Sequence, residues 1–140
     1  MNETKELIVP AKLDELPKVL EFIDRELERL ECSMKTQMQI DIAVEEIYVN
    51  IAHYAYQPGM EGDAKICCAV GGEPLKVSIQ FIDNGIPYNP LEKQDPNIAL
   101  SAEDRNIGGL GIFMVKKSMD NVTYNYEDGK NILTIHKSIT

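Results

Sequence analysis

The chain has 140 residues, a formal net charge of −9 at pH 7 and a pI near 4.7, and 44% of its residues are hydrophobic and 26% charged. Such a length allows one domain to bury about two thirds of the surface of its unfolded chain without disulfides or a structural metal, so we expect residues 1–140 to form a single domain. The acidic balance argues against nucleic acid and anionic membranes as direct partners, because both are bound through clustered Lys and Arg. A basic protein surface remains a compatible partner.

The three cysteines, an odd number, do not indicate a disulfide framework. Cys67 and Cys68 are adjacent in an apolar run, where successive side chains face opposite ways, so they and Cys32 are interpreted as small buried hydrophobic residues. The N-terminal segment MNETKELIVP has no apolar signal region, and no apolar stretch reaches the roughly 18 residues of a membrane span. We therefore expect a cytoplasmic protein.

The first predicted elements are a strand and an amphipathic helix. Glu6–Val9 is a short β-prone run that Pro10 ends. From Asp14 onward the apolar residues recur every three or four positions, which predicts a one-faced helix. Asp14 is the expected N-cap, and Pro17 suits the first turn. The apolar positions are Leu16, Val19, Leu20, Ile23, Leu27 and Leu30.

A second helix is predicted to begin after Ser33, its expected cap, and to end before Gln57-Pro58-Gly59. The stretch from Met38 to Tyr56 has a wide apolar face when it is projected at about 100° per residue. The face consists of Ile40, Ala43, Val44, Ile47, Tyr48, Ile51 and Ala55.

Glu46, Asn50 and His53 form a separate narrow stripe between apolar borders on the same helix, which a solvated face does not explain. Glu46 and Asn50 are four residues apart, so their Cβ atoms lie about 6 Å from each other. Mg²⁺ takes oxygen ligands and is usually shared with substrate phosphates, so Asn50 alone could supply the protein ligand. Glu46 could accept a proton from a hydroxyl or water that attacks a phosphoryl group. A hydrogen-bonded polar pair at a helix interface is an alternative interpretation.

The central part of the chain predicts a hairpin and then a long loop. Lys65–Val70 and Leu75–Ile82 are β-rich runs joined by Gly71-Gly72-Glu73-Pro74. Asp83-Asn84-Gly85 would indicate a second hairpin turn, but no partner strand follows it. Residues 86–107 contain three prolines and no sustained period. Because about 20 residues without regular structure are uncommon as a simple connector, we interpret them as a candidate lid.

The strand end at Asp83 has a chemistry of its own. A buried carboxylate is costly unless it is paired, and it accepts a hydrogen bond well from an exocyclic amino group such as that of adenine. Gly85 permits the backbone to pass close to a flat ring. The alternative, a plain turn at the end of a strand, is weakened by the missing hairpin partner.

The glycine run Gly108-Gly109-Leu110-Gly111 is predicted to open a helix that continues to Met119. Backbone N–H groups of such a run and the N-terminus of the helix can bind phosphates without lysines. Ile112 follows Gly111, and no Lys-Ser/Thr pair follows, so the run is not a Walker A loop. The alternative is a glycine-rich helix start. Arg105 could reach a terminal phosphate or be solvated.

Val122–Tyr126 and Asn131–Lys137 are the last predicted strands, on both sides of Glu127-Asp128-Gly129-Lys130. The predicted order is therefore strand, two helices, two strands, lid, helix, two strands. Helices and strands in comparable numbers without βαβ alternation predict an α+β fold, a two-layer sandwich of a mixed, mostly antiparallel sheet with helices on one face. The layout leaves a pocket between the second helix, the end of the Leu75 strand and the lid.

Three segments together resemble, in order and spacing, the N, G1 and G2 boxes of the GHKL (Bergerat-fold) ATPase superfamily. They are AVEEIYVNIAHYAY, FIDNGIPYNP and NIGGLGIFMVKKSMDNVTY. Within the superfamily, the chain is most similar to the stand-alone anti-sigma-factor serine/threonine kinases, and the resemblance covers roughly Met38 to Lys137. With 37 residues before Met38, the chain is not expected to be a sensor histidine kinase, a gyrase or a mismatch-repair protein.

The resemblance implies ATP and Mg²⁺ as cofactors and a role for each matched residue. Glu46 would be the general base, Asn50 the Mg²⁺ ligand and Asp83 the reader of the adenine amino group. Gly85 would permit the close approach of adenine. The remaining nucleotide-binding candidates are Gly108, Gly109, Leu110 and Gly111 around the phosphates, Thr134 beside the adenine, and His53, Pro87 and Arg105.

Family members hold a sigma factor inactive, usually dimerise and phosphorylate a Ser or Thr of an anti-anti-sigma (STAS-type) antagonist. The resemblance thus predicts an ATP-dependent protein serine/threonine kinase and anti-sigma factor in a partner switch. A second interpretation is a non-catalytic, ATP-gated binding module that sequesters a transcription regulator. A third is a plain α+β domain without a ligand.

Overall fold

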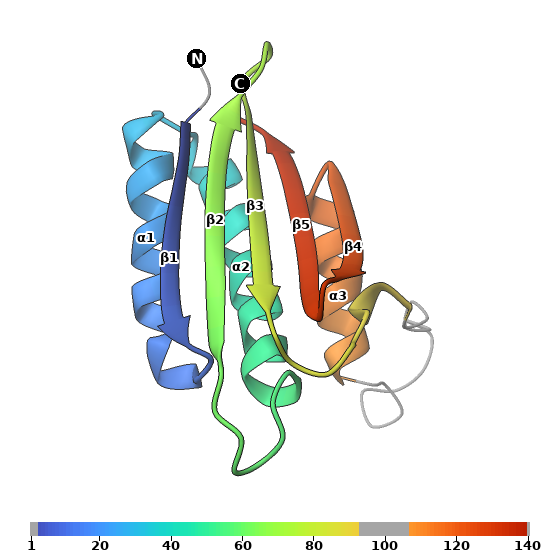
Figure 1. Cartoon of the computed structure of the whole chain (residues 1–140). Coiled ribbons are helices and arrows are strands. Elements are labelled where there is room, and N and C mark those ends of the chain that lie inside the picture. The colour runs from blue at the N-terminus through green and yellow to red at the C-terminus, as the bar shows by residue number, and fades with distance from the viewer. Residues whose placement is uncertain (1–2, 93–106, 140) are drawn as a thin grey trace.

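The computed structural model of the protein describes residues 3–92 and 107–139, and its elements alternate between one sheet and one helical layer (Figure 1). The strands are β1 (Glu3–Pro10), β2 (Asp63–Gly71), β3 (Lys76–Asp83), β4 (Asn121–Glu127) and β5 (Lys130–Ser138). The α-helices are α1 (Leu16–Arg29), α2 (Met34–Tyr54) and α3 (Ile107–Ser118), and the short 3-10 helices are η1 (Leu13–Glu15) and η2 (Pro90–Glu92).

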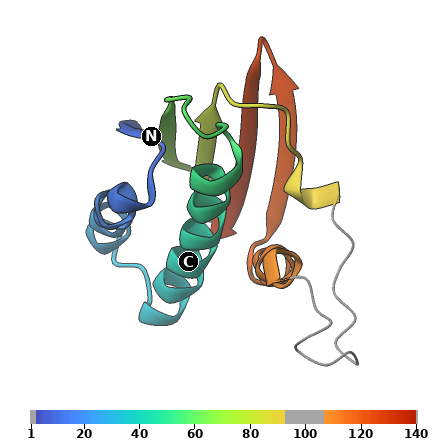
Figure 2. The same ribbon diagram turned by 90° about the horizontal axis from the view of Figure 1, so that it is seen from below.

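The five described strands form one sheet in the order β1-β2-β3-β5-β4, and all three α-helices cover the same face of it (Figure 2). The α+β two-layer prediction is therefore confirmed. The expected mixed sheet is wrong for these strands, because all four neighbouring pairs are antiparallel. Two helices rather than one connect β1 to β2, which returns the chain in the opposite direction, and β5 rather than β4 takes the place beside β3.

The predicted helix boundaries are confirmed in outline. The N-cap predicted at Asp14 is wrong, since Asp14 lies inside η1 and the cap position of α1 falls on Glu15, whose side chain makes no capping bond. Ser33 caps α2 as predicted, because its Oγ accepts a hydrogen bond from the backbone N–H of Thr36 at 3.1 Å. The helix ends at Tyr54, before Pro58.

The apolar face predicted for α2 is the centre of the core, and all seven of its residues are buried. Tyr48 lies at its middle with a side chain that is fully buried, and its hydroxyl is 2.7 Å from the Lys12 carbonyl oxygen and 3.0 Å from that of Pro10. This polar end fixes α2 to the segment that leaves β1. The helix is therefore held on the sheet, and Glu46 of its narrow stripe lies against Gly111 of α3.

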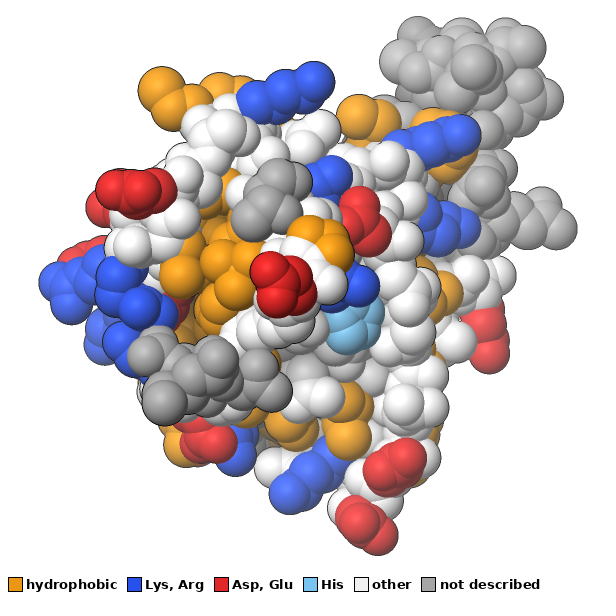
Figure 3. Space-filling model, turned by 90° about the horizontal axis from the view of Figure 1, so that it is seen from above, with side chains coloured by type: hydrophobic (Ala, Val, Ile, Leu, Met, Phe, Trp, Pro, Cys, Tyr) orange, Lys and Arg blue, Asp and Glu red, His pale blue; other side chains and the backbone are white. Residues whose placement is uncertain are grey.

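On the face drawn in Figure 3, acidic and basic side chains are mixed and do not form large patches of one sign. On the face at which both termini lie, acidic and basic side chains surround a central group of hydrophobic ones (Figure 3). Glu26 of α1 is the buried centre of an ion cluster: it is only 7% exposed and lies 2.8 Å from Lys5 of β1 and 2.9 Å from Arg29, whose own side chains are partly exposed. These bonds lower the pKa of Glu26 although burial opposes them. The cluster connects α1 to the edge strand.

All three cysteines are free thiols. Cys68 is buried as predicted, and burial raises the pKa of its thiol to about 12. Cys32 and Cys67 are half-buried. Among residues 3–92 and 107–139, no helix is both long and apolar enough to cross a membrane.

A cluster of three carboxylates, Asp24 and Glu28 of α1 and Asp41 of α2, leads to a prediction about stability. Burial and the neighbouring carboxylates of Asp24 and Glu28 raise the pKa of Asp41 from 3.8 to about 7. The folded chain therefore binds more protons than the unfolded chain between these two values, so that the free energy of unfolding falls as the pH rises from about 4 to 7.

Asp41→Asn removes this ionisation, and we expect it to stabilise the protein by about 1 kcal/mol at pH 8, after allowance for solvent screening, and by much less at pH 5. Urea unfolding at both pH values measures the difference. Asp14→Asn, on the exposed η1, is the matched control. An equal effect of Asp41→Asn at the two pH values would contradict the prediction.

Candidate nucleotide-binding site

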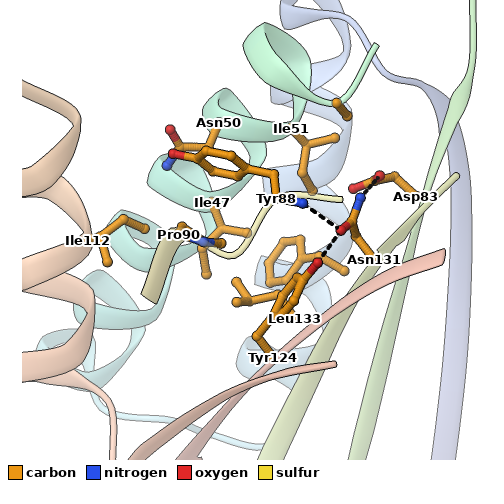
Figure 4. A pocket seen from close by; sticks show the side chains of 12 residues that line it. Ile47, Asn50, Ile51, Asp83, Tyr88, Pro90, Ile112, Tyr124, Asn131 and Leu133 are labelled. Carbon is orange, nitrogen blue, oxygen red and sulfur yellow. Dashed lines mark hydrogen bonds between the residues drawn. The ribbon is translucent and has the colours of Figure 1, made fainter. Parts of the chain in front are cut away.

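A hollow lies where α2, the helix-covered face of the sheet and the loop after β3 meet (Figure 4). Helix α2 contributes three of the lining residues and Ala55, just after its end, is a fourth; the sheet contributes five, the segment after β3 two and α3 one. The lining residues are Ile47, Asn50, Ile51, Ala55, Phe81, Asp83, Tyr88, Pro90, Ile112, Tyr124, Asn131 and Leu133. Its walls are largely apolar, with a carboxylate and two amides directed into it, which is typical of sites for flat organic ligands.

Asp83 lies at the end of β3 and is 5% exposed. Its Oδ1 accepts two hydrogen bonds of 2.9 Å, from Asn131 Nδ2 and from the backbone N–H of Gly85. Burial raises the pKa of the carboxyl group, and these two donors oppose the rise. Its other oxygen accepts no hydrogen bond from the described residues, so Oδ2 is the atom that an exocyclic amino group can reach.

Glu46 and Asn50 lie one turn apart on α2 beside the hollow. The Asn50 side chain is 8% exposed, and its Nδ2 donates to the Glu46 carbonyl at 3.1 Å and to Glu46 Oε1 at 3.4 Å. The polar pair considered as an alternative is therefore present. Because the nitrogen of Asn50 is used in this way, the amide oxygen is the atom that can bind a cation, and the two interpretations are compatible.

The glycine run of the sequence lies inside α3 rather than before it. The helix begins at Ile107, so that Gly108, Gly109 and Leu110 belong to its first turn and Gly111 follows them. A Cβ at Gly111 would lie 2.1 Å from Glu46 Cδ. The absence of a side chain thus allows the Glu46 carboxylate to lie against α3. The first four N–H groups of the helix have no partner within it, so the predicted phosphate-binding role still fits this end.

Arg105 and most of the predicted lid fall within residues 93–106, outside the described residues. The described start of the loop lies over the hollow. Tyr88 contributes to its wall and stacks on the exposed Tyr54 with 5.6 Å between ring centroids and 24° between ring planes. The enclosed free volume is about 40 Å³, room for a few water molecules but not for a purine. A nucleotide base needs more room than this, so we expect side chains of the wall, Tyr88 among them, to shift when a nucleotide binds.

Gly85 lies in close contact with the end of α2, and its role toward adenine stays a prediction. A Cβ at this position would lie 2.1 Å from the Ala55 carbonyl oxygen, at the end of α2. The next residue, Ile86, donates its backbone N–H to the same oxygen at 2.9 Å. Gly85 therefore lets the loop pass the end of α2, and it is not among the residues that line the hollow.

Three further candidates lie away from the hollow. Thr134 opposes Gln80 in β3, whereas the residues of β3 that face the hollow, Phe81 and Asp83, oppose Leu133 and Asn131. The prediction for Thr134 is thus corrected: side chains alternate along a strand, and Thr134 lies on the other face of the sheet. His53 is exposed and lines a separate hollow with Lys12 and Gln57.

Pro87 is exposed and does not line the main hollow either. The structure thus brings Asn50 and Asp83 together at one hollow, with Glu46 and Gly111 in contact beside it. Within the described part of the chain, no group of three or more His, Cys, Asp or Glu side chains could hold a metal ion by itself. An oxygen ligand such as Asn50, shared with substrate phosphates, fits Mg²⁺ without such a group.

The comparisons with known proteins agree with this geometry. Residues 9–137 match the family described as the histidine kinase-like ATPase domain. The chain belongs to this family. The match includes α2, β3, α3 and β5, and therefore every described residue of the candidate site.

Three relatives that are similar to this chain are named as protein kinases or as an anti-sigma factor. The serine/threonine-protein kinase BtrW of Bordetella bronchiseptica is 29% identical over 103 residues, 74% of this chain and 71% of the relative. The serine-protein kinase RsbW of Listeria monocytogenes serovar 1/2a is 28% identical over 98 residues, 67% of this chain and 61% of the relative. The anti-sigma F factor of Clostridium acetobutylicum is 28% identical over 98 residues, 70% of this chain and 66% of the relative.

Sequence reasoning missed the polar residue at the centre of the hollow, Asn131. It was placed at the start of a strand but given no role. Since two antiparallel strands of similar length pair end to end, the first residues of β5 oppose the end of β3, where Asp83 lies. The sequence therefore offered Asn131 only as the first residue of a strand, and the pairing of β5 with β3 is what gives it a role.

Proposed function

We propose that the chain is an ATP-dependent protein serine/threonine kinase that also acts as an anti-sigma factor, and that it phosphorylates a Ser or Thr of an anti-anti-sigma antagonist. The observation that carries the proposal is the convergence on one hollow of the Asp83 carboxylate and the Asn50 amide, with the Glu46 carboxylate one helical turn from Asn50. The family and the names of the three relatives support the proposal.

Each residue then has a distinct task. Asp83 Oδ2 accepts a hydrogen bond from the adenine amino group, and the N-terminal turn of α3 receives the phosphates. Asn50 Oδ1 would hold Mg²⁺, which would neutralise phosphate charge when it is bound. Glu46 takes the proton of the partner's hydroxyl while the oxygen forms its bond to the γ-phosphorus, the bond to the β,γ-bridging oxygen breaks, and ADP leaves with the electron pair.

The closed loop adds a requirement to this proposal. Since the free volume of the hollow is about 40 Å³, we expect ATP binding to displace residues of its wall, Tyr88 among them. Tyr88 stacks on the exposed Tyr54, so the stack is the contact that has to open. Binding that orders the loop around the phosphates would then couple nucleotide occupancy to the shape that partners meet.

The partners and the setting are part of the same proposal. A sigma factor and its antagonist would bind the protein directly, without nucleic acid or membrane contact, and the protein would act as a homodimer in the cytoplasm. The net charge of −9 favours partner surfaces that carry basic residues.

The test is phosphate transfer from γ-labelled Mg-ATP to a candidate antagonist with and without its acceptor Ser or Thr. We expect label on the intact antagonist only, and a thermal shift with ATP that corresponds to about 2.7 kcal/mol at 100 times the dissociation constant. ATP binding without transfer to any antagonist would instead indicate the ATP-gated binding module. No thermal shift with any nucleotide would contradict both.

A further inference from the structure

We infer that Asn131 is a positioning residue that fixes the Asp83 carboxylate and thereby sets the selectivity of the site for a purine with an exocyclic amino group. The inference rests on the proposed function, because it assumes that the hollow receives a nucleotide base. Figure 4 shows Asn131 between Asp83 and Tyr124, with Tyr88 on its other side.

Every hydrogen-bonding position of the Asn131 amide is used. Its Nδ2 donates to Asp83 Oδ1 at 2.9 Å and to the Ile86 carbonyl at 2.8 Å. Its Oδ1 accepts from the backbone N–H of Tyr88 at 3.1 Å and from the Tyr124 hydroxyl. An amide has two hydrogens and two lone pairs, so this buried side chain, 6% exposed, is fully satisfied. No other uncharged side chain offers the same four positions in that volume.

These bonds fix the orientation of the Asp83 carboxylate. Oδ1 is held by Asn131 from β5 and by the N–H of Gly85 from the loop, from two different sides. The terminal torsion of an Asp side chain is broad, so a carboxylate without such donors can rotate. With Oδ1 fixed, Oδ2 is directed to the part of the hollow that no described donor occupies. The acceptor is thus presented before the base arrives.

The same amide also holds the start of the loop. Its bonds to Ile86 and Tyr88 lie on both sides of Pro87, so the segment that covers the hollow is attached to the residue that orients Asp83. Opening of the loop therefore has to break the bond from Tyr88, while the bond from Nδ2 to Asp83 can persist. Asn131 can therefore keep Asp83 in place while the loop opens. Its effect on base selectivity can be measured apart from its effect on loop opening.

The test compares ATP with purine riboside 5′-triphosphate, which lacks only the amino group. Wild type should prefer ATP by about 10- to 100-fold, the range expected for a hydrogen bond to a charged acceptor. In Asn131→Ala we expect this preference to fall at least fivefold, because the lost bonds to the loop affect both nucleotides alike and cancel in the ratio of the two affinities. Tyr124→Phe removes only the hydroxyl partner of Oδ1 and should keep the preference.

Asn131→Leu provides a second variant if the alanine variant does not fold. Leucine has nearly the size and shape of asparagine and fills the same volume, but it has no hydrogen to donate to Asp83, so the preference should fall as well. An equal loss of affinity for both nucleotides, or an unchanged preference in both variants, would overturn the inference in favour of a purely structural role. Failure of wild type to bind either nucleotide would instead contradict the proposed function.

Discussion

Glu46→Gln should lower the rate of phosphate transfer to the antagonist by about 10²- to 10⁴-fold and leave the affinity for ATP within about threefold of wild type. The reason is that Gln keeps the shape and an oxygen that can accept from Asn50 Nδ2, which lies 3.4 Å from Glu46 Oε1. It also fits against Gly111 as Glu46 does. What it loses is the ability to take a proton from the attacking hydroxyl.

Single-turnover transfer from labelled ATP, measured together with ATP binding by calorimetry, separates these quantities. Glu45→Gln is the matched control, because Glu45 precedes it on the same helix but is exposed. The control should transfer at the wild-type rate. A Glu46→Gln variant with an unchanged transfer rate would show that another group takes the proton, whereas a variant that no longer binds ATP would assign Glu46 to binding rather than to proton transfer.

The fold could be predicted from the sequence because its determinants are local and periodic. The apolar face of α2, the Ser33 cap and the two hairpins each depend on residues close together in the chain, and each is confirmed. The purely antiparallel sheet could not be predicted, because strand order depends on how the long connections return. The same connections place β5 beside β3, a pairing that no local pattern encodes.

The candidate site could be predicted only where its residues lie on one element or at its end. Asn50 and Glu46 follow from helical spacing, and Asp83 from the end of a buried strand. Thr134 was placed beside the adenine by the family resemblance alone, and the register of β5 turns its side chain to the other face of the sheet. Asn131 was missed because the pairing of β5 with β3 could not be read from the sequence.

Gly85 was singled out for a close approach to adenine, and the close contact that the structure describes is with the end of α2, which leads to the second large effect. Gly85→Ala should destabilise the protein by about 3 kcal/mol or more, a fall in Tm of roughly 10 °C. The added Cβ would lie 2.1 Å from the Ala55 carbonyl oxygen and 2.6 Å from its carbon. Both are backbone atoms of the last turn of α2, so neither can rotate away as a side chain would.

The loop would have to withdraw from α2, which breaks the 2.9 Å bond from the Ile86 N–H to Ala55 and moves the N–H of Gly85 from Asp83 Oδ1. The substitution should therefore also weaken ATP binding in whatever fraction remains folded. Gly59→Ala is the informative contrast: φ is +89° there, but nothing lies within 4 Å of the added Cβ, so the cost is about 1 kcal/mol from backbone conformation alone. Urea unfolding of both variants distinguishes lack of space from an unfavourable φ, and a Gly85→Ala protein no less stable than Gly59→Ala would mean that the loop does not pass α2 as closely as described.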